Sequence, residues 1–224
     1  MGRRSDGDTQ RFEGNLIKNK LHPKIKLDVH ITVVTLTESI NSHGLGDNTM
    51  NTTRNITINA TGDKVWAVFA HDFDNAYKWM ASIPKSFGQN NGKKYEGASS
   101  AGRVCELDGN PNGLQATESF LAYDEEKRTC TVLIQFLNTP FGFPLVQNVA
   151  EFSLSEQGDN QSVVTFSVTS TLKPLAFIMY PIIKLGFGSV VNQIIEELKF
   201  YVENGTPHPR KVKALGKMKL SANA

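Results

Sequence analysis

Apolar and polar residues alternate along five consecutive runs between Gly102 and Leu172. The runs cover residues 102–108, 114–123, 129–137, 143–155 and 162–172, and short, mostly polar segments separate them. A period of two is typical of strands that bury one face, and short polar turns join strands that are antiparallel neighbours. The pattern therefore predicts an antiparallel meander rather than parallel strands joined by crossover helices.

A strand followed by two short helices is predicted before the meander. Asn55–Ala60 alternates as a strand does, and Thr61 is placed to cap the helix that follows it. An apolar stripe at helical spacing then follows, formed by Val65, Val68, Phe69 and Phe73. A second short helix carries Trp79 and ends at Pro84, and the Gly- and Asn-rich segment Lys85–Gly97 is predicted to be a loop.

A long helical segment, Pro174–Asn204, closes the pattern. Its second half is amphipathic, and Gly205 is well placed to end it. Its first half is apolar nearly all round, which allows a transmembrane span over Leu172–Val191. Two lysines, Pro181 and two glycines disfavour a span. We therefore expect a helix buried on both sides, with core beneath it and a pocket above it, which Pro181 starts or kinks.

The two ends of the chain stand apart from this pattern. Lys24–Leu36 alternates like a strand, but it lies between a charged leader and a polar loop, Asn41–Arg54. It is either an added edge strand, an appendage, or translated upstream sequence, since Met50 directly precedes the clear pattern. The predicted division is an N-terminal extension with one added strand or disorder (1–49), a main domain (50–205) and a basic C-terminal tail (206–224).

The charge is distributed unevenly along this globular chain of 224 residues, which has a formal net charge of +2. Met50–Asn204 holds 12 Lys and Arg against 16 Asp and Glu, whereas His208–Ala224 holds five positive residues and no acid. A nucleic-acid-binding face needs a basic stripe on the domain itself, so we expect no nucleic-acid partner. Basic ends can touch nucleic acid or anionic lipid, but we interpret them as solvated, mobile tails.

The two cysteines, Cys105 and Cys130, fall on strands that we place two apart, which is too far for a disulfide. The sequence contains no Cys-x-x-Cys and no mixed Cys/His cluster, so neither a metal nor a cofactor is predicted. Reduced cysteines and the lack of an apolar export signal favour a cytoplasmic location.

Glu118 and Asn148 are polar residues on otherwise apolar strand faces. Glu118 alternates with Ala116, Phe120 and Ala122, and Asn148 alternates with Ala150. Burying either side chain unpaired is costly, so each needs a partner or water. Lone polar groups that converge on an apolar cavity are typical of a ligand site. Alternatively, Glu118 lies on a solvated face, because its strand is rich in other polar residues.

The order of strand, two helices, strand meander and long helix resembles the helix-grip fold of the SRPBCC/START-like superfamily, and within it the polyketide cyclase/dehydrase-like family. The residues that carry the resemblance are ITINATGDKVWAVFAHDF (56–73), Trp79, GRVCEL (102–107), LQATESFLAYDEEKRT (114–129), PLVQNVAEFSLSE (144–156) and LKFYVENG (198–205). The resemblance implies an α+β fold in which a curved antiparallel sheet wraps around a long C-terminal helix.

The resemblance also implies a hydrophobic cavity between sheet and helix, with a glutamate at Glu118 and an asparagine-containing element at Leu145–Asn148. The chain departs from the family pattern at Cys105, where relatives often have an arginine that can pair with the glutamate. Arg103, on the same strand face, is the candidate substitute. A tryptophan of the last strand appears here as Phe166, which also makes the cavity wall more apolar.

Two functions from different classes follow. We expect a binding or transport protein for a small lipid-like, isoprenoid or aromatic, polyketide-like molecule, without stable transmembrane anchoring. The alternative is a metal-independent cyclase or dehydratase in which Glu118 is the general base. A third reading is a protein-interaction module. The predicted ligand-binding residues are Trp79, Cys105, Glu118, Phe120, Ile134, Asn148, Phe152, Phe166, Met179 and Ile183.

Overall fold

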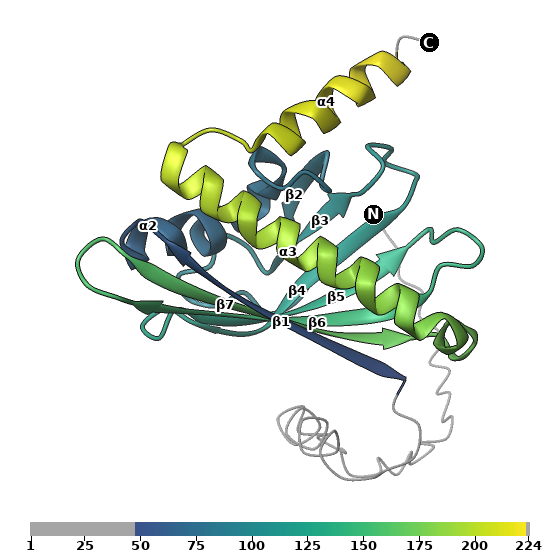
Figure 1. Ribbon diagram of the computed structural model, residues 1–224, viewed down its shortest axis with the longest axis horizontal. Coiled ribbons are helices and arrows are strands. Elements are labelled where there is room, and N and C mark those ends of the chain that lie inside the picture. The colour runs from purple at the N-terminus through teal and green to yellow at the C-terminus, as the bar shows by residue number, and fades with distance from the viewer. Residues whose placement is uncertain (1–47, 223–224) are drawn as a thin grey trace, which may run out of the picture. The chain divides into compact units, whose positions relative to one another are not determined.

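A seven-stranded antiparallel sheet is the main feature of the computed structural model, which describes residues 48–222 (Figure 1). The strands are β1 (Thr49–Ile58), β2 (Lys85–Gln89), β3 (Gly102–Glu106), β4 (Gln115–Asp124), β5 (Thr129–Leu137), β6 (Leu145–Glu156) and β7 (Ser162–Leu172). Their order in the sheet is β1-β7-β6-β5-β4-β3-β2, so β1 and β2 are the edges. The predicted meander is confirmed for its five strands.

Two strand predictions were incomplete, and both concern the edges of the sheet. Residues Thr49–Arg54, expected as the end of a polar loop, belong to β1, where Met50 is buried opposite Ser170 of β7. β2 falls inside the segment Lys85–Gly97 that we expected to be a loop. An edge strand exposes much of its surface, so its sequence need not alternate, and backbone pairing with the next strand decides its conformation.

The helices before the meander are short and irregular. Thr61 caps α2 (Gly62–Trp66) as predicted, its Oγ1 accepting a hydrogen bond from the Lys64 N–H at 3.3 Å. The chain continues as a π-helical turn, η1 (Ala67–His71), and a 3₁₀ helix, η2 (Phe73–Lys78). The predicted apolar stripe is confirmed in its main members, which are buried: Val65, Phe69 and Phe73.

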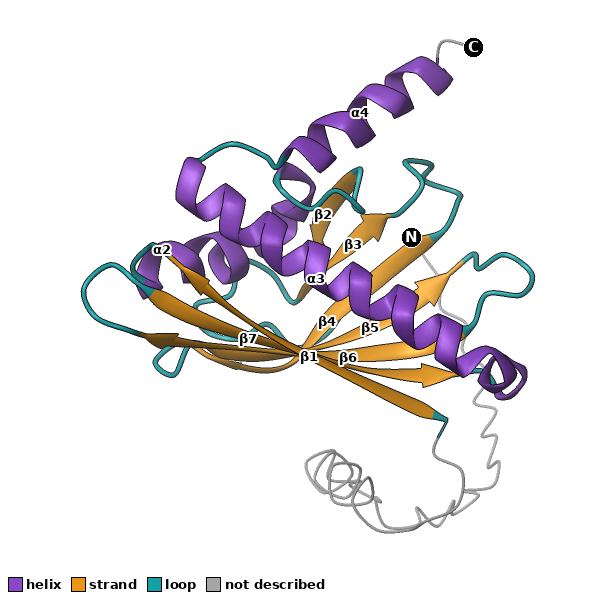
Figure 2. Ribbon diagram, viewed as in Figure 1, coloured by secondary structure: helices purple, strands orange, loops and turns teal. Residues whose placement is uncertain are grey.

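A 3₁₀ segment, η3 (Pro174–Met179), leads into the long helix α3 (Tyr180–Asn204). Pro181 lies in the first turn of α3, where a missing N–H is tolerated. Gly205 ends the helix in the left-handed conformation, with φ of 69°, and its N–H donates to the Tyr201 carbonyl. Figures 1 and 2 show α3 crossing one face of the sheet, so the predicted α+β arrangement is confirmed.

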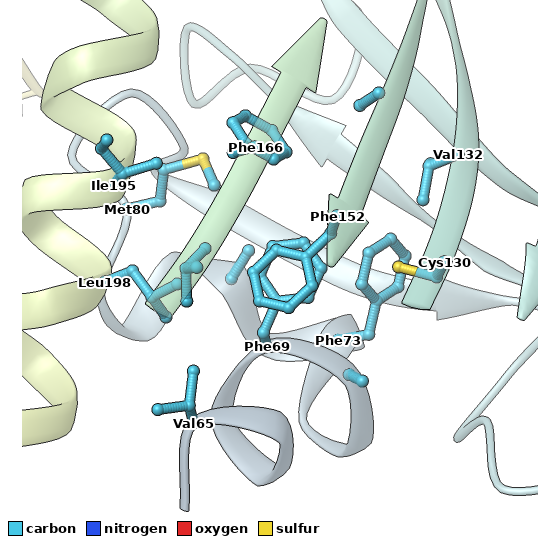
Figure 3. Packing of buried hydrophobic residues seen from close by; sticks show 14 of the residues in the cluster. Val65, Phe69, Phe73, Met80, Cys130, Val132, Phe152, Phe166, Ile195 and Leu198 are labelled. Atoms are coloured by element: carbon cyan, nitrogen blue, oxygen red, sulfur yellow. The ribbon is translucent and has the colours of Figure 1, made fainter. Parts of the chain in front are cut away.

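The hydrophobic core lies between this face of the sheet, the short helices and the second half of α3 (Figure 3). Phe69 of η1 stacks on Phe152 of β6 with ring centroids 3.7 Å apart. Ile195 and Leu198 of α3 close the core from the opposite side. The core therefore anchors the second half of α3 and leaves its first half to other contacts.

The first half of the closing segment is not buried on both sides, and that prediction was wrong. Leu175, Ile178 and Leu185 expose 83%, 82% and 79% of their surface, and no residue of α3 before Gly188 is buried. The helix packs along the edge strand β1, with fewer contacts to β7, so only part of its circumference is covered. An apolar sequence alone cannot distinguish a covered helix from one with an open apolar side.

The basic C-terminal segment is also more ordered than the expected mobile tail. Residues Pro209–Ala222 form helix α4. Arg210 at its start binds the carboxylates of Glu196 and Glu197 on α3, each at 2.9 Å. The buried Lys211 donates its Nζ to the Ile83 carbonyl at 2.7 Å. Two of the positive side chains of the C-terminal segment, Arg210 and Lys211, therefore hold α4 against the domain.

Several predictions fall on residues that are not described. The possible strand Lys24–Leu36 and nearly all of the predicted extension, residues 1–47, lie outside the described range. Among residues 48–222, no helix combines the length and the apolar character needed to cross a membrane.

Candidate ligand-binding site

One row of inward-facing residues crosses the sheet beneath α3, and we call it the polar row. Residues directly opposite on neighbouring strands share a face, so the register identifies its members. From β3 to β1 they are Arg103, Glu118, Ile134, Asn148, Ser170 and Met50. Four of the six side chains are polar, although the row lies on the buried face of the sheet.

Arg103 and Glu118 form a buried ion pair at one end of the polar row. Arg103 Nη2 lies 2.7 Å from Glu118 Oε2, and the two side chains expose only 7% and 8% of their surface. Arg103 also donates from Nη1 to the Phe73 carbonyl at 2.8 Å, and its guanidinium stacks 4.0 Å from the centre of the Phe73 ring. Position 105 holds a cysteine, and Arg103 is the residue that pairs with Glu118 instead.

The same pair sets the chemistry of Cys105. Its Sγ donates to Glu118 Oε1 at 3.5 Å, so both carboxylate oxygens of Glu118 have a partner. Burial and the nearby Glu118 charge raise the pKa of the Cys105 thiol well above its usual range. Burial alone would lower the pKa of Arg103, but the attraction of Glu118 raises it overall. Cys105 is therefore a neutral hydrogen-bond donor rather than a nucleophile.

Asn148 and Ser170 occupy the middle of the polar row without partners. Among the described residues, five buried side-chain nitrogen or oxygen atoms have no hydrogen-bond partner in the protein. Three of them belong to the polar row, namely Arg103 Nε, Asn148 Oδ1 and Ser170 Oγ. Each unpaired group costs about 1–3 kcal/mol. Unpaired buried polar atoms are therefore concentrated in this row.

Apolar rows flank the polar row on both sides. The row nearer α2 consists of Phe120, Val132, Ala150 and Val168, and Phe152 and Phe166 follow beyond it. The alternation of β4 breaks at a bulge after Phe120, so Ala122, which we expected on the inner face, is exposed. Sequence alternation cannot reveal a bulge, because the extra residue changes the face without changing the composition.

An open groove of about 900 Å³ lies at the end of the sheet, beyond the starts of β6 and α3. Its walls are the loop Thr139–Pro144, the segment Lys173–Ala176, Met179 and Ile183. At ~3.3 Å per residue along a strand, Ser170 lies about 10 Å from Lys173 at the groove wall. One elongated ligand is long enough to span this distance between the polar row and the groove.

Nine of the ten predicted ligand-binding residues lie on the inner face of the sheet or at the groove. Cys105, Glu118, Phe120, Ile134, Asn148, Phe152 and Phe166 face inward from the sheet, and Met179 and Ile183 line the groove. Trp79 is the exception, because it follows η2 and is buried in the core, away from both the sheet strands and the groove lining. Their contact with a ligand stays a prediction.

Sequence reasoning missed several residues of this region. Ser170 interrupts the apolar face of β7 as Asn148 interrupts that of β6, but it is not among the predicted binding residues. The loop Thr139–Pro144 lacked any periodic pattern. Phe187 and Ile194 of α3 pack against the core yet stay partly exposed, which depends on how the helix lies and cannot be read from its sequence.

The described residues offer little for other kinds of chemistry. Within residues 48–222, no three His, Cys, Asp or Glu side chains lie close enough to hold a metal ion. Cys105 and Cys130 are free and buried, and burial raises the pKa of Cys130 to about 12. Neither thiol is therefore ionised at neutral pH, and the inner face is mainly a surface for contact and hydrogen bonding.

Comparisons with known proteins agree with this architecture. The sequence profile of a family described as polyketide cyclase/dehydrase and lipid transport matches residues 49–203. No match was found among curated proteins.

Solved structures share the fold at low sequence identity. A START superfamily protein from Mycobacterium smegmatis superposes with a TM-score of 0.55 and 13% identity, covering 70% of this chain and 99% of the other. The protein XoxI from Bacillus cereus gives 0.50 and 22%, with 69% and 96% covered. A norcoclaurine synthase point mutant from Thalictrum flavum, bound to a transition-state analogue, gives 0.50 and 15%, with 71% and 97% covered. At these identities the likeness is one of fold.

Proposed function

The chain belongs to the polyketide cyclase/dehydrase and lipid-transport family, and on this premise we propose that it binds a small hydrophobic ligand between the inner face of the sheet and α3. The ligand is lipid-like, isoprenoid or aromatic and polyketide-like. The cytoplasmic location expected from the sequence is part of the proposal, because both cysteines are free thiols.

The observation that carries this proposal is apolar surface that faces inward and is still accessible. Ile134 and Phe136 of β5 point toward α3, and Phe187 and Ile194 of α3 pack on the same core, yet all four are only partly buried. Phe136 contacts Phe143 of the groove wall, with ring centroids 5.0 Å apart. The groove, at about 900 Å³, has the size of an ordinary ligand site. Covering about 300 Å² of apolar surface contributes roughly 7 kcal/mol before the costs of association.

Glu118 has an orienting role in this proposal. Both of its oxygens already accept a hydrogen bond, from Arg103 and from Cys105, so a substrate has to compete with these partners to give its proton to Glu118. A general base needs a free oxygen within hydrogen-bond reach of the reacting group. This geometry favours a carrier over the cyclase or dehydratase alternative, in which the ion pair has to open first.

The test measures binding in solution. Native mass spectrometry of the purified protein is expected to reveal a co-purified apolar molecule, and the neutral fluorescent reporter N-phenylnaphthylamine is expected to bind at one site. The variant Ile134→Trp fills the inner face and should abolish reporter binding. Leu133→Trp places the same ring on the opposite face of β5 and should leave binding unchanged. Equal binding by both variants, or none by the wild type, would contradict the proposed function.

A further inference from the structure

Asn148 and Ser170 form a paired site within the polar row. They are directly opposite each other on β6 and β7, so their side chains leave the same face side by side. Asn148 exposes 6% of its surface and Ser170 none, and Asn148 Oδ1 and Ser170 Oγ have no partner in the protein. A protein that only needed a stable core would place apolar residues at both positions, so the pair suggests a specific occupant.

Partly exposed apolar side chains lie between the groove and the pair. The loop Thr139–Pro144 follows β5 in the chain. Phe136 and then Ile134 are met along β5 with increasing distance from this loop, and both lie on the inner face and stay partly exposed. Ile134 is directly opposite Asn148 in the polar row. An extended apolar molecule that enters from the groove therefore passes Phe136 and Ile134 before its far end meets Asn148 and Ser170.

The hydrogen-bonding character of the pair matches a hydroxyl group. Asn148 Oδ1 is an acceptor, and the Ser170 hydroxyl is a donor that also accepts. A ligand hydroxyl donates to the first and accepts from the second, so it satisfies both atoms at once. The Asn148 amide can also turn to present its NH₂ group, and a hydroxyl still fits, because it can accept as well as donate.

The surroundings disfavour a negatively charged end at this pair. The nearest cation along the row, Arg103, lies three strands from Asn148, about 14 Å away at ~4.8 Å per strand. It is already paired with Glu118 and the Phe73 carbonyl. A carboxylate at the pair would be buried without a counter-ion in the polar row and would lie about 10 Å from the like charge of Glu118.

We propose that Asn148 and Ser170 bind the inner, polar end of the ligand, and that this end is an uncharged hydroxyl of an alcohol or a phenol. The proposal rests on the proposed function, since it specifies which hydrophobic ligand the site takes. The chain of the ligand lies along Ile134 and Phe136 toward the groove. The Arg103–Glu118 pair stays closed in this arrangement and forms the end wall of the row.

The test compares ligands that share a chain and differ only at the polar end. Dodecanol, its methyl ether and dodecanoate each displace N-phenylnaphthylamine from the full-length protein. We expect dodecanol to bind about tenfold more tightly than the ether, which accepts but cannot donate a hydrogen bond. Asn148→Leu should remove this preference and Ser170→Ala should reduce it, while the affinity for dodecanoate stays unchanged in both.

Gln147→Leu is the matched control, because it makes the same kind of change on the opposite face of β6; it should keep the tenfold preference. Melting curves establish that each variant is folded, and Ser170→Ala serves if Asn148→Leu does not fold. Equal affinities for alcohol and ether in the wild type, or a preference that survives both variants, would overturn the inference while leaving the proposed function intact. If no ligand displaces the reporter, the proposed function itself fails.

Discussion

The buried ion pair between Arg103 and Glu118 gives the sharpest test of how this site is built. With 7% and 8% of their side-chain surfaces exposed, neither charge can turn to solvent when its partner is removed. Glu118→Leu leaves the guanidinium unpaired, and Arg103→Met leaves the carboxylate unpaired. Each change should lower the free energy of unfolding by about 3–5 kcal/mol.

The double variant Arg103→Met, Glu118→Leu should lose far less than the two single variants together. No unpaired charge is left in it, and the main cost is the Phe73 carbonyl, which loses its donor and accounts for about 1–3 kcal/mol. Independent effects would sum to about 6–10 kcal/mol, so we expect a coupling of at least ~3 kcal/mol between the two positions.

Urea denaturation followed by circular dichroism measures each of these free energies, provided that the slope with denaturant stays constant. The matched control is the exposed pair Lys127–Asp124, whose atoms lie as close, at 2.6 Å. The same double-variant cycle there should give a coupling below about 0.5 kcal/mol, since solvent screens the pair. Additive losses at Arg103 and Glu118, or single losses below ~1 kcal/mol, would refute a buried, desolvated pair.

Three further predictions concern other parts of the chain. Burial raises the pKa of Cys130 to about 12, so at pH 8 Ellman's reagent should label the native thiol about a thousandfold more slowly than the unfolded one. Because the native thiol keeps a proton that the unfolded one releases, its contribution to stability should also fall as pH rises above about 9. Arg210→Ala leaves the buried Glu197 without its cation and should cost about 1–3 kcal/mol in urea denaturation; an unchanged midpoint would mean that α4 is not held there. Leu175→Ser with Ile178→Ser, at side chains more than four-fifths exposed, should change stability by less than ~0.5 kcal/mol and reduce self-association in sedimentation experiments.

Alternation along the chain was enough to predict the meander, because each of its strands buries one face and exposes the other. The positions of Glu118 and Asn148 on the inner face followed from the same pattern and are confirmed. Thr61 as a helix cap and Gly205 as a helix end were also readable, since each acts on its own neighbouring backbone. Local rules suffice where the interacting groups are close in sequence.

Predictions failed where the outcome depends on contacts between distant segments. β2 is a strand because it pairs with β3, and Ala122 is exposed because β4 bulges. Leu185 was expected to be covered, but α3 packs along β1 and leaves that side open. In each case the residues themselves allow either state, and a partner far along the chain selects one.

The sequence by itself determined most of the residues that face inward, and therefore that an apolar surface interrupted by a few polar groups would form. The tertiary structure alone decided how those polar groups combine. Register across the sheet places Arg103 opposite Glu118, so that their charges pair, and places Asn148 opposite Ser170, where Asn148 Oδ1 and Ser170 Oγ stay without partners. The physical reason is that hydrogen bonds and ion pairs act over a few ångströms, and only strand pairing brings such distances to residues that are far apart in the chain.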